Sequence, residues 1–158
     1  MKVSFHGATQ SVTGSCHLVT CGDKRILIDC GLYQGGREIE NENHGDFGFD
    51  PAQIDYLLLT HAHLDHCGRI PLLVKRGFSG EIITTAASRE LARLVMLDSA
   101  HINEEEAGRR ARQAARRGKD VAGIKPLYST LDALNSLDYF GHTAQYETPV
   151  RLGEHVQA

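Results

Sequence analysis

The sequence predicts an α/β layered fold, because stretches with strand and helix patterns alternate along its 158 residues. The clearest strand is the nearly continuous apolar run at residues 54–60, which is typical of a strand covered on both faces. The clearest helical pattern begins at Ser88, where apolar residues recur three and four positions apart. A chain of this length can form one domain with its own hydrophobic core.

The first thirty residues are predicted to form strands. Residues 2–6 read as a first strand, and residues 7–14 as a turn-rich connection. Residues 16–20 and 25–29 are short apolar runs on either side of Gly22-Asp23, which is a hairpin signal. We therefore expect three strands before residue 30.

The middle of the chain is predicted to hold a long loop, a strand, a helix and another strand. Residues 31–51 are rich in Gly, Asn, Asp and Glu and have no period, and such long loops are usually functional or disordered. The apolar strand at 54–60 follows. Residues 68–77 are predicted to form a short helix, because Pro71 is tolerated in a first turn and a glycine ends the segment. Residues 81–85 read as another strand.

Two separate helices are predicted after residue 85, followed by a third. Asn103 is expected to cap the second helix, whose first turn is acidic and whose end is rich in arginine, as the helix dipole favours. The pattern Ser129-x-x-Asp132 indicates a capping box for the third helix, which is expected to end near Phe140. Two strands are predicted at 149–152 and 155–158.

The composition is that of an ordinary globular chain, with 41% apolar and 23% charged residues. The formal net charge of -3 gives no overall attraction to nucleic acid. No run approaches the roughly 18 apolar residues that a membrane span needs, and residues 1–6 contain no stretch typical of a signal peptide. The four cysteines show no C-x-x-C spacing. We therefore expect a reduced, cytoplasmic chain with no membrane partner, in which the cysteines are small buried side chains.

A dense group of metal-ligand residues follows the apolar strand, in the order His61-Ala62-His63-Leu64-Asp65-His66. Imidazole and carboxylate are ligands that zinc prefers. His61 and His63 can point the same way toward one metal, whereas Asp65 and His66 lie past a turn and suit a second. The spacing therefore predicts two metals about 3.5–4 Å apart. The alternative is a polar loop whose histidines satisfy one another, which fits one stray histidine better than four ligands in six residues.

This pattern resembles the signature of the metallo-β-lactamase superfamily. Its continuation at residues 66–71, His-Cys-Gly-Arg-Ile-Pro, resembles the version in the β-CASP branch, whose members are ribonucleases that process RNA. Residues 7–19 (GATQSVTGSCHLV), 27–35 (LIDCGLYQG) and 47–51 (FGFDP) are similar to other parts of that branch. The resemblance covers most of residues 1–95, and the remainder is similar in layout only.

The resemblance implies a metallo-β-lactamase-type αββα sandwich with zinc at one edge. Its two ions would be held here by His61, His63, Asp65 and His66. Asp29 matches the first motif of the family, an aspartate that orients the metal loop through hydrogen bonds. Without the resemblance, Asp29 would be read as a polar residue that ends a strand.

The resemblance also implies ligands that this sequence lacks. A third histidine, a bridging aspartate and a last histidine belong to later motifs of the family, and the inserted β-CASP domain is not found. We therefore expect residues 1–158 to be a partial metallo-β-lactamase domain, the N-terminal part of a longer chain. Its half-built zinc site would bind metal weakly or not at all, and the part alone would be inactive.

The remaining candidate residues are interpreted as structural. Cys67 is expected to be buried rather than a thiolate ligand. The basic run at 109–119 could meet RNA phosphates by charge, but a solvated helix face is the preferred interpretation. Satisfied histidines rather than ligands are expected at His6, His17, His101, His142 and His155.

The leading hypothesis is a zinc-dependent hydrolase of RNA phosphodiester bonds, with Asp65 as metal ligand and proton acceptor. RNA would be the substrate; exonuclease action, endonuclease action and self-association as a homo-oligomer all stay open. One alternative is another hydrolase on this fold, such as a thioesterase or lactonase, and the extension at 66–71 argues against it. The other is a non-catalytic scaffold paralogue that binds RNA or a processing partner, and the intact ligand pattern argues against that.

Overall fold

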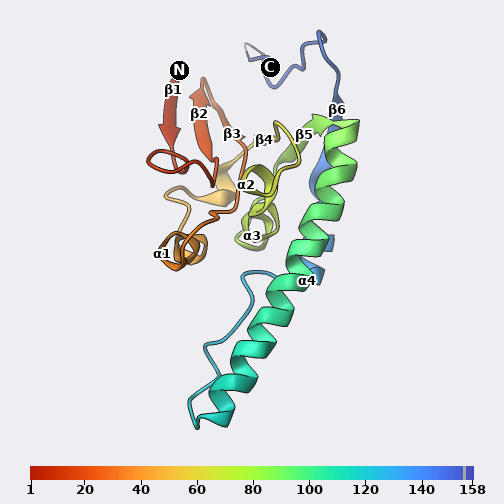
Figure 1. The fold of residues 1–158 in the computed structure, drawn as a ribbon. Helices are drawn as coiled ribbons and strands as arrows, with labels where there is room; N and C mark the ends of the chain where they lie inside the picture. The colour runs from red at the N-terminus through yellow and green to blue at the C-terminus, as the bar shows by residue number, and fades with distance from the viewer. Residues whose placement is uncertain (155) are drawn as a thin grey trace.

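A six-stranded sheet, whose strands lie in the same order as in the sequence, forms the centre of the computed structural model (Figure 1). The structure describes residues 1–154 and 156–158, with Arg37 described by its backbone alone. The strands are β1 (Lys2–Phe5), β2 (His17–Cys21), β3 (Lys24–Ile28), β4 (Tyr56–Leu58), β5 (Glu81–Thr85) and β6 (Phe140–Ala144).

Strand pairing changes from antiparallel to parallel at β3. The strands β1, β2 and β3 pair antiparallel, and Gly22, with a φ of 61°, makes the tight turn between the last two. From β3 to β6 all pairs are parallel, so each connection has to cross over. The predicted strands and the hairpin in the first thirty residues are thus confirmed.

Helices make up these crossovers and the loop that precedes β4. They are α1 (Arg37–Asn41), α2 (Leu64–Cys67), α3 (Ile70–Lys75), α4 (Ala86–Arg116) and α5 (Thr130–Ser136), with short 3-10 helices η1 (Glu42–His44), η2 (Pro51–Gln53) and η3 (Leu137–Tyr139). No helix within the described residues is both long and apolar enough to cross a membrane.

Two sequence-based expectations about helices were wrong. The segment 31–51 contains α1 and η1 in place of an unstructured loop. The two helices predicted after residue 85 are one continuous helix of 31 residues, and Asn103 does not cap it. Its side-chain amide instead donates to the Ser99 carbonyl one turn earlier, at 2.8 Å, so the side chain that suggested a helix start is used inside the helix.

The C-terminal part was predicted correctly at its start and less well afterwards. Ser129 and Asp132 form the expected capping box of α5. The helix ends at Ser136, and β6, which was not predicted, begins at Phe140. Of the two strands expected at 149–158, the described residues show a bridge between Arg151 and Gln157, and His155 lies outside the described residues.

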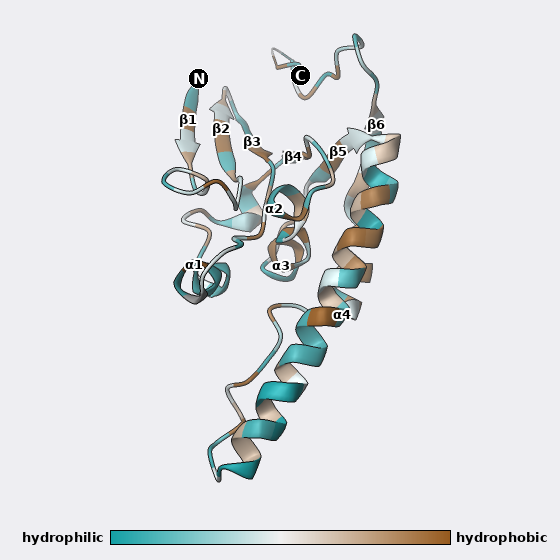
Figure 2. Cartoon of the chain, in the orientation of Figure 1, coloured by the Kyte–Doolittle hydropathy of each residue, from teal (hydrophilic) through white to brown (hydrophobic). Residues whose placement is uncertain are grey.

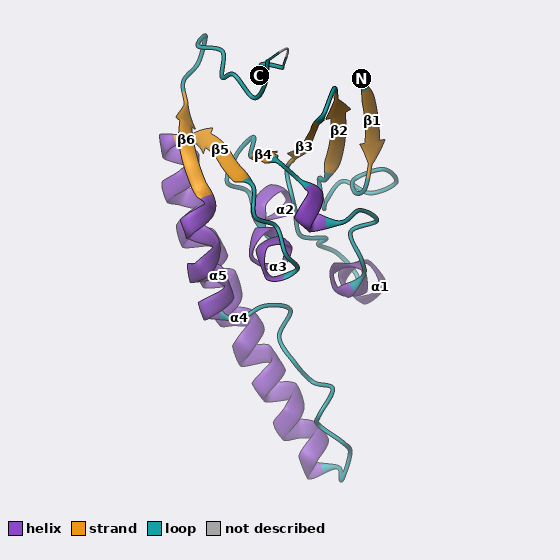
Figure 3. Cartoon of the chain, turned by 180° about the vertical axis from the view of Figure 1, so that it is seen from behind, coloured by secondary structure: helices purple, strands orange, loops and turns teal. Residues whose placement is uncertain are grey.

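The hydrophobic core lies between the sheet and the helices. Leu27, Leu57 and Ile82 point from three neighbouring strands toward buried residues of α3 and α4 such as Leu73 and Met96. Figures 1 and 3, seen from opposite sides, show α4 lying across β5 and β6 and then extending beyond the sheet. One sheet with its helix layer is thus present, which corresponds to half of an αββα sandwich.

A smaller cluster lies on the opposite face of the sheet. Ile26 and Ile83 alternate in direction with the core residues beside them and pack with Leu152 from the C-terminal segment. The strands β3 and β5 each bury neighbouring apolar residues on the two faces of the sheet, and Figure 2 shows brown, hydrophobic stretches within the sheet. This arrangement places the carboxyl ends of β3 and β4 side by side at one edge of the sheet.

Candidate metal centre

The four predicted ligands lie just past the carboxyl end of β4. After Leu58 the chain stays beside β5, because the Leu59 amide donates to the Ile83 carbonyl at 3.0 Å. Ala62 is buried, while His61 is half-buried and His63 is exposed, so the two histidines share one side of an extended segment. His63 then occupies the N-cap position of α2, and this one-turn helix carries Asp65 and His66.

The structure brings the three histidine rings together. The ring centroids of His61 and His63 are 4.6 Å apart, and those of His61 and His66 are 4.0 Å apart. Asp65 Oδ2 lies 3.6 Å from His66 Nε2. Within the described residues, no three histidine, cysteine or acidic side chains are arranged so that they could hold one metal ion. The four candidate ligands are adjacent, and their division into two pairs stays a prediction.

Asp29 is the residue around which this edge is organised. It follows β3 with a φ of 60°, and it is buried. Its Oδ1 accepts from the Thr60 amide at 2.9 Å, and its Oδ2 accepts from the Ser15 hydroxyl at 3.1 Å. Its Oδ2 also lies 2.7 Å from His66 Nδ1. Aspartate tolerates a left-handed backbone conformation better than most residues. At Asp29 this conformation directs the carboxylate toward the histidine cluster.

The Asp29 contact fixes the tautomer of His66. An ionised carboxylate can only accept, so His66 Nδ1 must be the donor and the lone pair of the neutral ring lies on Nε2. The Thr60 hydroxyl lies 3.0 Å from His61 Nδ1, which leaves His61 Nε2 uncommitted in the same way. The donor chemistry therefore fits a zinc site, since neutral imidazole nitrogens and a carboxylate are available at one edge.

Burial and the neighbouring imidazoles hold the pKa of His61 below its ordinary value. Desolvation is the largest cause, and the charges that His66 and His63 would carry add to it. A lowered pKa keeps the ring of His61 neutral at physiological pH, which is the form that binds a metal.

Backbone hydrogen bonds attach α2 to the segment before β2 and to the loop after β3. The Ser15 amide donates to the Asp65 carbonyl at 2.9 Å, and the Cys30 amide donates to the His66 carbonyl at 2.8 Å. A Cβ atom on Gly31 would lie 1.6 Å from the Asp65 carbonyl oxygen, so only glycine fits there. The positions of Asp65 and His66 are thus set by a segment more than thirty residues earlier.

Arg69 holds the loop after β3 from the buried side. It is buried, its Nε donates to the Gly31 carbonyl at 2.7 Å, and its guanidinium lies over the rings of Tyr33 and Phe47. Sequence reasoning quoted Arg69 only as part of a motif and gave Ser15 and Thr60 no role. An arginine inside the otherwise apolar run at 67–74 was the signal that could have identified it, because arginine is rarely fully buried without a partner.

The other histidines and Cys67 lie away from the cluster or serve packing. His6 and His17 are half-buried, but His6 Nε2 and His17 Nδ1 have no hydrogen-bond partner within the described residues, so the expectation of satisfied histidines was wrong for them. His101 and His142 are exposed, beside Glu105 and Glu81. Cys67 is buried as expected, and burial raises the pKa of its thiol to about 12.

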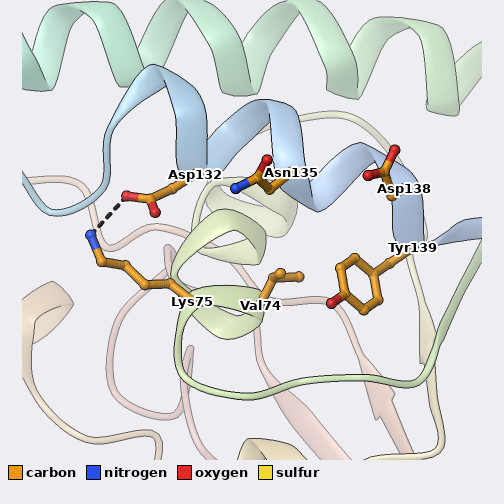
Figure 4. A pocket seen from close by; sticks show the side chains of 6 residues that line it. All are labelled: Val74, Lys75, Asp132, Asn135, Asp138 and Tyr139. Atoms are coloured by element: carbon orange, nitrogen blue, oxygen red, sulfur yellow. Dashed lines mark hydrogen bonds and ion pairs between the residues drawn. The ribbon is translucent and has the colours of Figure 1, made fainter.

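Two hollows in the described part of the chain are lined by none of the four candidate ligands. One, of about 410 Å³, lies between α3 and α5, and Figure 4 shows the ion pair of Lys75 and Asp132 at its edge. The other, of about 820 Å³, lies between α4 and the segment around η1, and Leu64 reaches it.

Comparison with known proteins gives relatives for most of the chain. The family profile described as Metallo-beta-lactamase superfamily matches residues 11–127. A ribonuclease of Thermus thermophilus is 45% identical over 105 residues, which are 66% of this chain and 24% of the relative. A transcription termination factor of Methanocaldococcus jannaschii is 36% identical over 106 residues, which are 67% of this chain and 17% of the relative. The matched part is thus about a quarter of each relative's length or less.

Further comparisons extend this picture. A homologue of Integrator complex subunit 11 from Dictyostelium discoideum is 33% identical over 115 residues, which are 68% of this chain and 15% of the relative. Among solved structures, a subclass B3 metallo-β-lactamase of Bradyrhizobium japonicum matches 96% of this chain and 46% of its own with a TM-score of 0.51. Its sequence identity is 17%, so this likeness concerns the fold alone.

Proposed function

Because this chain belongs to the metallo-beta-lactamase superfamily and resembles its β-CASP RNA-processing branch, we propose that it is part of a zinc-dependent hydrolase of RNA phosphodiester bonds. The ribonuclease and the termination factor among its relatives support RNA as the substrate class. The observation that carries the proposal is the Asp29–His66 contact of 2.7 Å, because it holds a histidine of the ligand pattern in the tautomer that binds a metal.

The proposed ligands are His61, His63, Asp65 and His66. The chemistry that a pair of divalent ions supplies when bound is stabilisation of the negative charge that develops on a phosphoryl oxygen. His61 and His66 would present their Nε2 atoms, which the Thr60 and Asp29 contacts leave uncommitted. Asp65, whose half-buried carboxylate lies 3.6 Å from His66 Nε2, would be a further ligand and would also act as a proton acceptor.

The number of ligands predicts weak metal binding by these residues alone. A tetrahedral zinc needs four ligands, and the pattern offers two for each ion, so we propose that residues 1–158 form part of a metallo-β-lactamase domain whose other ligands lie elsewhere in the protein. We expect less than one zinc per chain, and His61→Ala should abolish it, whereas His101→Ala on exposed α4 should not. Stoichiometric zinc that survives a chelator would contradict this.

Activity is tested on the complete protein. We expect metal-dependent cleavage of single-stranded RNA and no useful turnover of lactams or thioesters. Asp65→Ala should lower the cleavage rate much more than RNA affinity, because it removes a metal ligand and leaves phosphate contacts in place. Asp46→Ala, which removes an exposed carboxylate, is the matched control.

Three outcomes would overturn the proposal. Turnover of a thioester or lactone with RNA left intact would indicate another hydrolase of this fold. RNA binding without zinc and without any hydrolysis would indicate a scaffold paralogue. Unchanged RNA cleavage by Asp65→Ala would remove this site from the mechanism.

A further inference from the structure

The last third of α4 carries its positive charges on one face. Five arginines occupy positions 109, 110, 112, 116 and 117, and Lys119 follows directly. At about 100° per residue the five arginines fall within roughly 160° of the helix circumference. We call these five arginines and Lys119 the basic tip; Figure 1 shows this part of α4 extending beyond the sheet.

The opposite face of the same helix segment is made of small residues. It consists of Ala107, Gly108, Ala111, Ala114 and Ala115. Figures 1 and 3 both show the segment after α4 running back beside the helix, and Ala107 is buried. The Lys119 amide donates to the Ala114 carbonyl at 3.0 Å, and Gly118, with a φ of 64°, makes the turn. Most of the small face is thus buried or half-buried, whereas all five arginines are exposed.

Most of the charge in the basic tip is not compensated within the protein. Arg109 and Arg110 both lie near Glu106, at 3.6 and 3.2 Å. The other four members form no ion pair with any described side chain, and all are exposed: Arg112, Arg116, Arg117 and Lys119. The sequence from 107 to 119 contains no acidic residue.

The helix dipole explains only part of this pattern. Cations stabilise the end of a helix, but the effect fades beyond the last turn, and Arg109 lies two turns before the end of α4. A helix face that only needs to be solvated usually mixes both signs of charge. A row of five arginines on one face needs a different reason.

We propose that the basic tip binds the phosphate backbone of single-stranded RNA, at a place separate from the histidine cluster. Guanidinium groups pair with phosphate oxygens through two parallel hydrogen bonds. Arginines one turn apart, such as Arg112 and Arg116, have Cβ atoms about 5–6 Å from each other. Their guanidinium groups can therefore contact separate phosphates, which suits a polyanion better than a single phosphate ion. The choice of RNA rests on the proposed function.

The composition of the tip also defines the mode of binding. The segment 102–127 contains no aromatic residue, so bases cannot stack there and the binding should be independent of sequence and strongly dependent on salt. The arginine face carries no large apolar side chain of the kind that a helix on a membrane surface inserts.

The basic tip lies far along α4 from Val95, so it could contact a part of the RNA remote from the histidine cluster. Val95 and Leu64 both line the larger hollow, and Arg112 is seventeen residues beyond Val95 along the same helix. At 1.5 Å per residue this is roughly 25 Å. A long RNA strand could bind the basic tip and the histidine cluster at the same time. A very short RNA could reach only the histidine cluster.

The test compares two triple variants of the chain that remove the same charge. R112Q/R116Q/R117Q alters the basic tip, and K2Q/R93Q/R151Q alters exposed cations elsewhere. Fluorescence anisotropy with a labelled single-stranded RNA, in the presence of a chelator, should show that the tip variant raises Kd about tenfold and lowers the slope of log K against log salt by about 2. The control variant should change neither. R112K/R116K/R117K should keep the salt slope, because lysine keeps the charge, and should lose part of the affinity, because lysine cannot form the paired hydrogen bonds. Circular dichroism establishes that each variant folds.

Separate measurements distinguish failure of this inference from failure of the proposed function. RNA affinity that depends on the tip would support the inference even if the complete protein cleaves no RNA. RNA affinity equal in the tip and control variants would overturn it, even if the complete protein is a ribonuclease. Binding of the tip to anionic lipid vesicles or an acidic peptide, with RNA ignored, would also overturn it.

Discussion

The carboxylate of Asp29 and the imidazole Nδ1 of His66 lie 2.7 Å apart, although 37 residues separate them in the sequence. Parallel pairing of β3 with β4 makes this contact, because it places the ends of both strands at the same edge. Asp29 also accepts hydrogen bonds from Ser15 and Thr60. One carboxylate thus connects three segments and sets the orientation of a proposed ligand.

Asp29→Asn should weaken zinc binding by about 10- to 100-fold. The amide can donate to His66 Nδ1, which would move the ring proton to Nε2 and block the atom that we propose as a metal ligand. Asparagine tolerates left-handed backbone, so the loss should not come from strain at this position. Competition with a chromophoric chelator measures the affinity, with Asp23→Asn in the exposed hairpin turn as control. Equal zinc affinity in both variants would refute the tautomer argument.

Gly31→Ala should destabilise the chain by about 3 kcal/mol. The added methyl group would lie within 1.6 Å of the Asp65 carbonyl, and backbone has to move to make room. Gly123→Ala, where no atom lies within 4 Å of the added Cβ, should have little effect. Urea denaturation of both variants gives the comparison. A Gly31→Ala chain as stable as the wild type would show that the loop after β3 is not held against α2.

The Asp132 carboxylate should stabilise the protein at neutral pH, where it is ionised, and should stop doing so in strong acid. Burial tends to raise its pKa, but hydrogen bonds from Lys75 and Ser129 outweigh this and leave the pKa below its ordinary value. Its stabilisation is therefore present above the unfolded-state pKa and lost as the pH falls through the lower folded-state pKa. The difference in unfolding free energy between wild type and Asp132→Asn should be seen at neutral pH and vanish in strong acid.

Asp138→Asn provides the control for this pH dependence. Asp138 lines the hollow between α3 and α5, as Asp132 does (Figure 4). Its side chain is exposed and has no hydrogen-bond partner among the described residues. Its substitution should leave stability nearly unchanged at both pH values. A pH-independent loss for Asp132→Asn would mean that its charge does not contribute.

Alkylation of the native chain should modify Cys21 first. Cys16, Cys30 and Cys67 are fully buried, and burial raises the pKa of Cys67 to about 12, so little reactive thiolate forms. Cys21 is half-buried on β2. Iodoacetamide followed by peptide mass spectrometry should therefore find label at Cys21 alone until denaturant is added. Early labelling of Cys67 would show that the segment carrying the histidine cluster opens in solution.

The sequence predicted those parts of the fold whose signals are local. The hairpin at Gly22, the buried strand at β4 and the capping box at Ser129 depend on neighbouring residues, and all three were found. The continuous α4 was missed because Asn103 carries a capping signal whose outcome depends on the helix around it. The strand β6 was missed because its pairing with β5 brings together residues about sixty positions apart.

The candidate site shows the same limit. The ligand pattern was visible as a contiguous motif, and Asp29 was identified only through a family resemblance. The supporting roles of Ser15, Thr60 and Arg69 depend on contacts across the sheet edge, which no local spacing encodes. The relative placement of the histidine rings could not be predicted either, because it depends on where α2 begins.

The agreement between strand order and chain order has a consequence for biosynthesis. Each strand pairs with the one before it, so the sheet can grow strand by strand as the polypeptide leaves the ribosome. The longest interval between the synthesis of two neighbouring strands follows β5, because α4 and α5 must be synthesised before β6 can pair with β5. During that interval one edge of β5 has no partner strand, which is the condition that favours aggregation. Slowed translation between residues 86 and 139 should therefore lower the yield of folded protein more than slowing anywhere earlier.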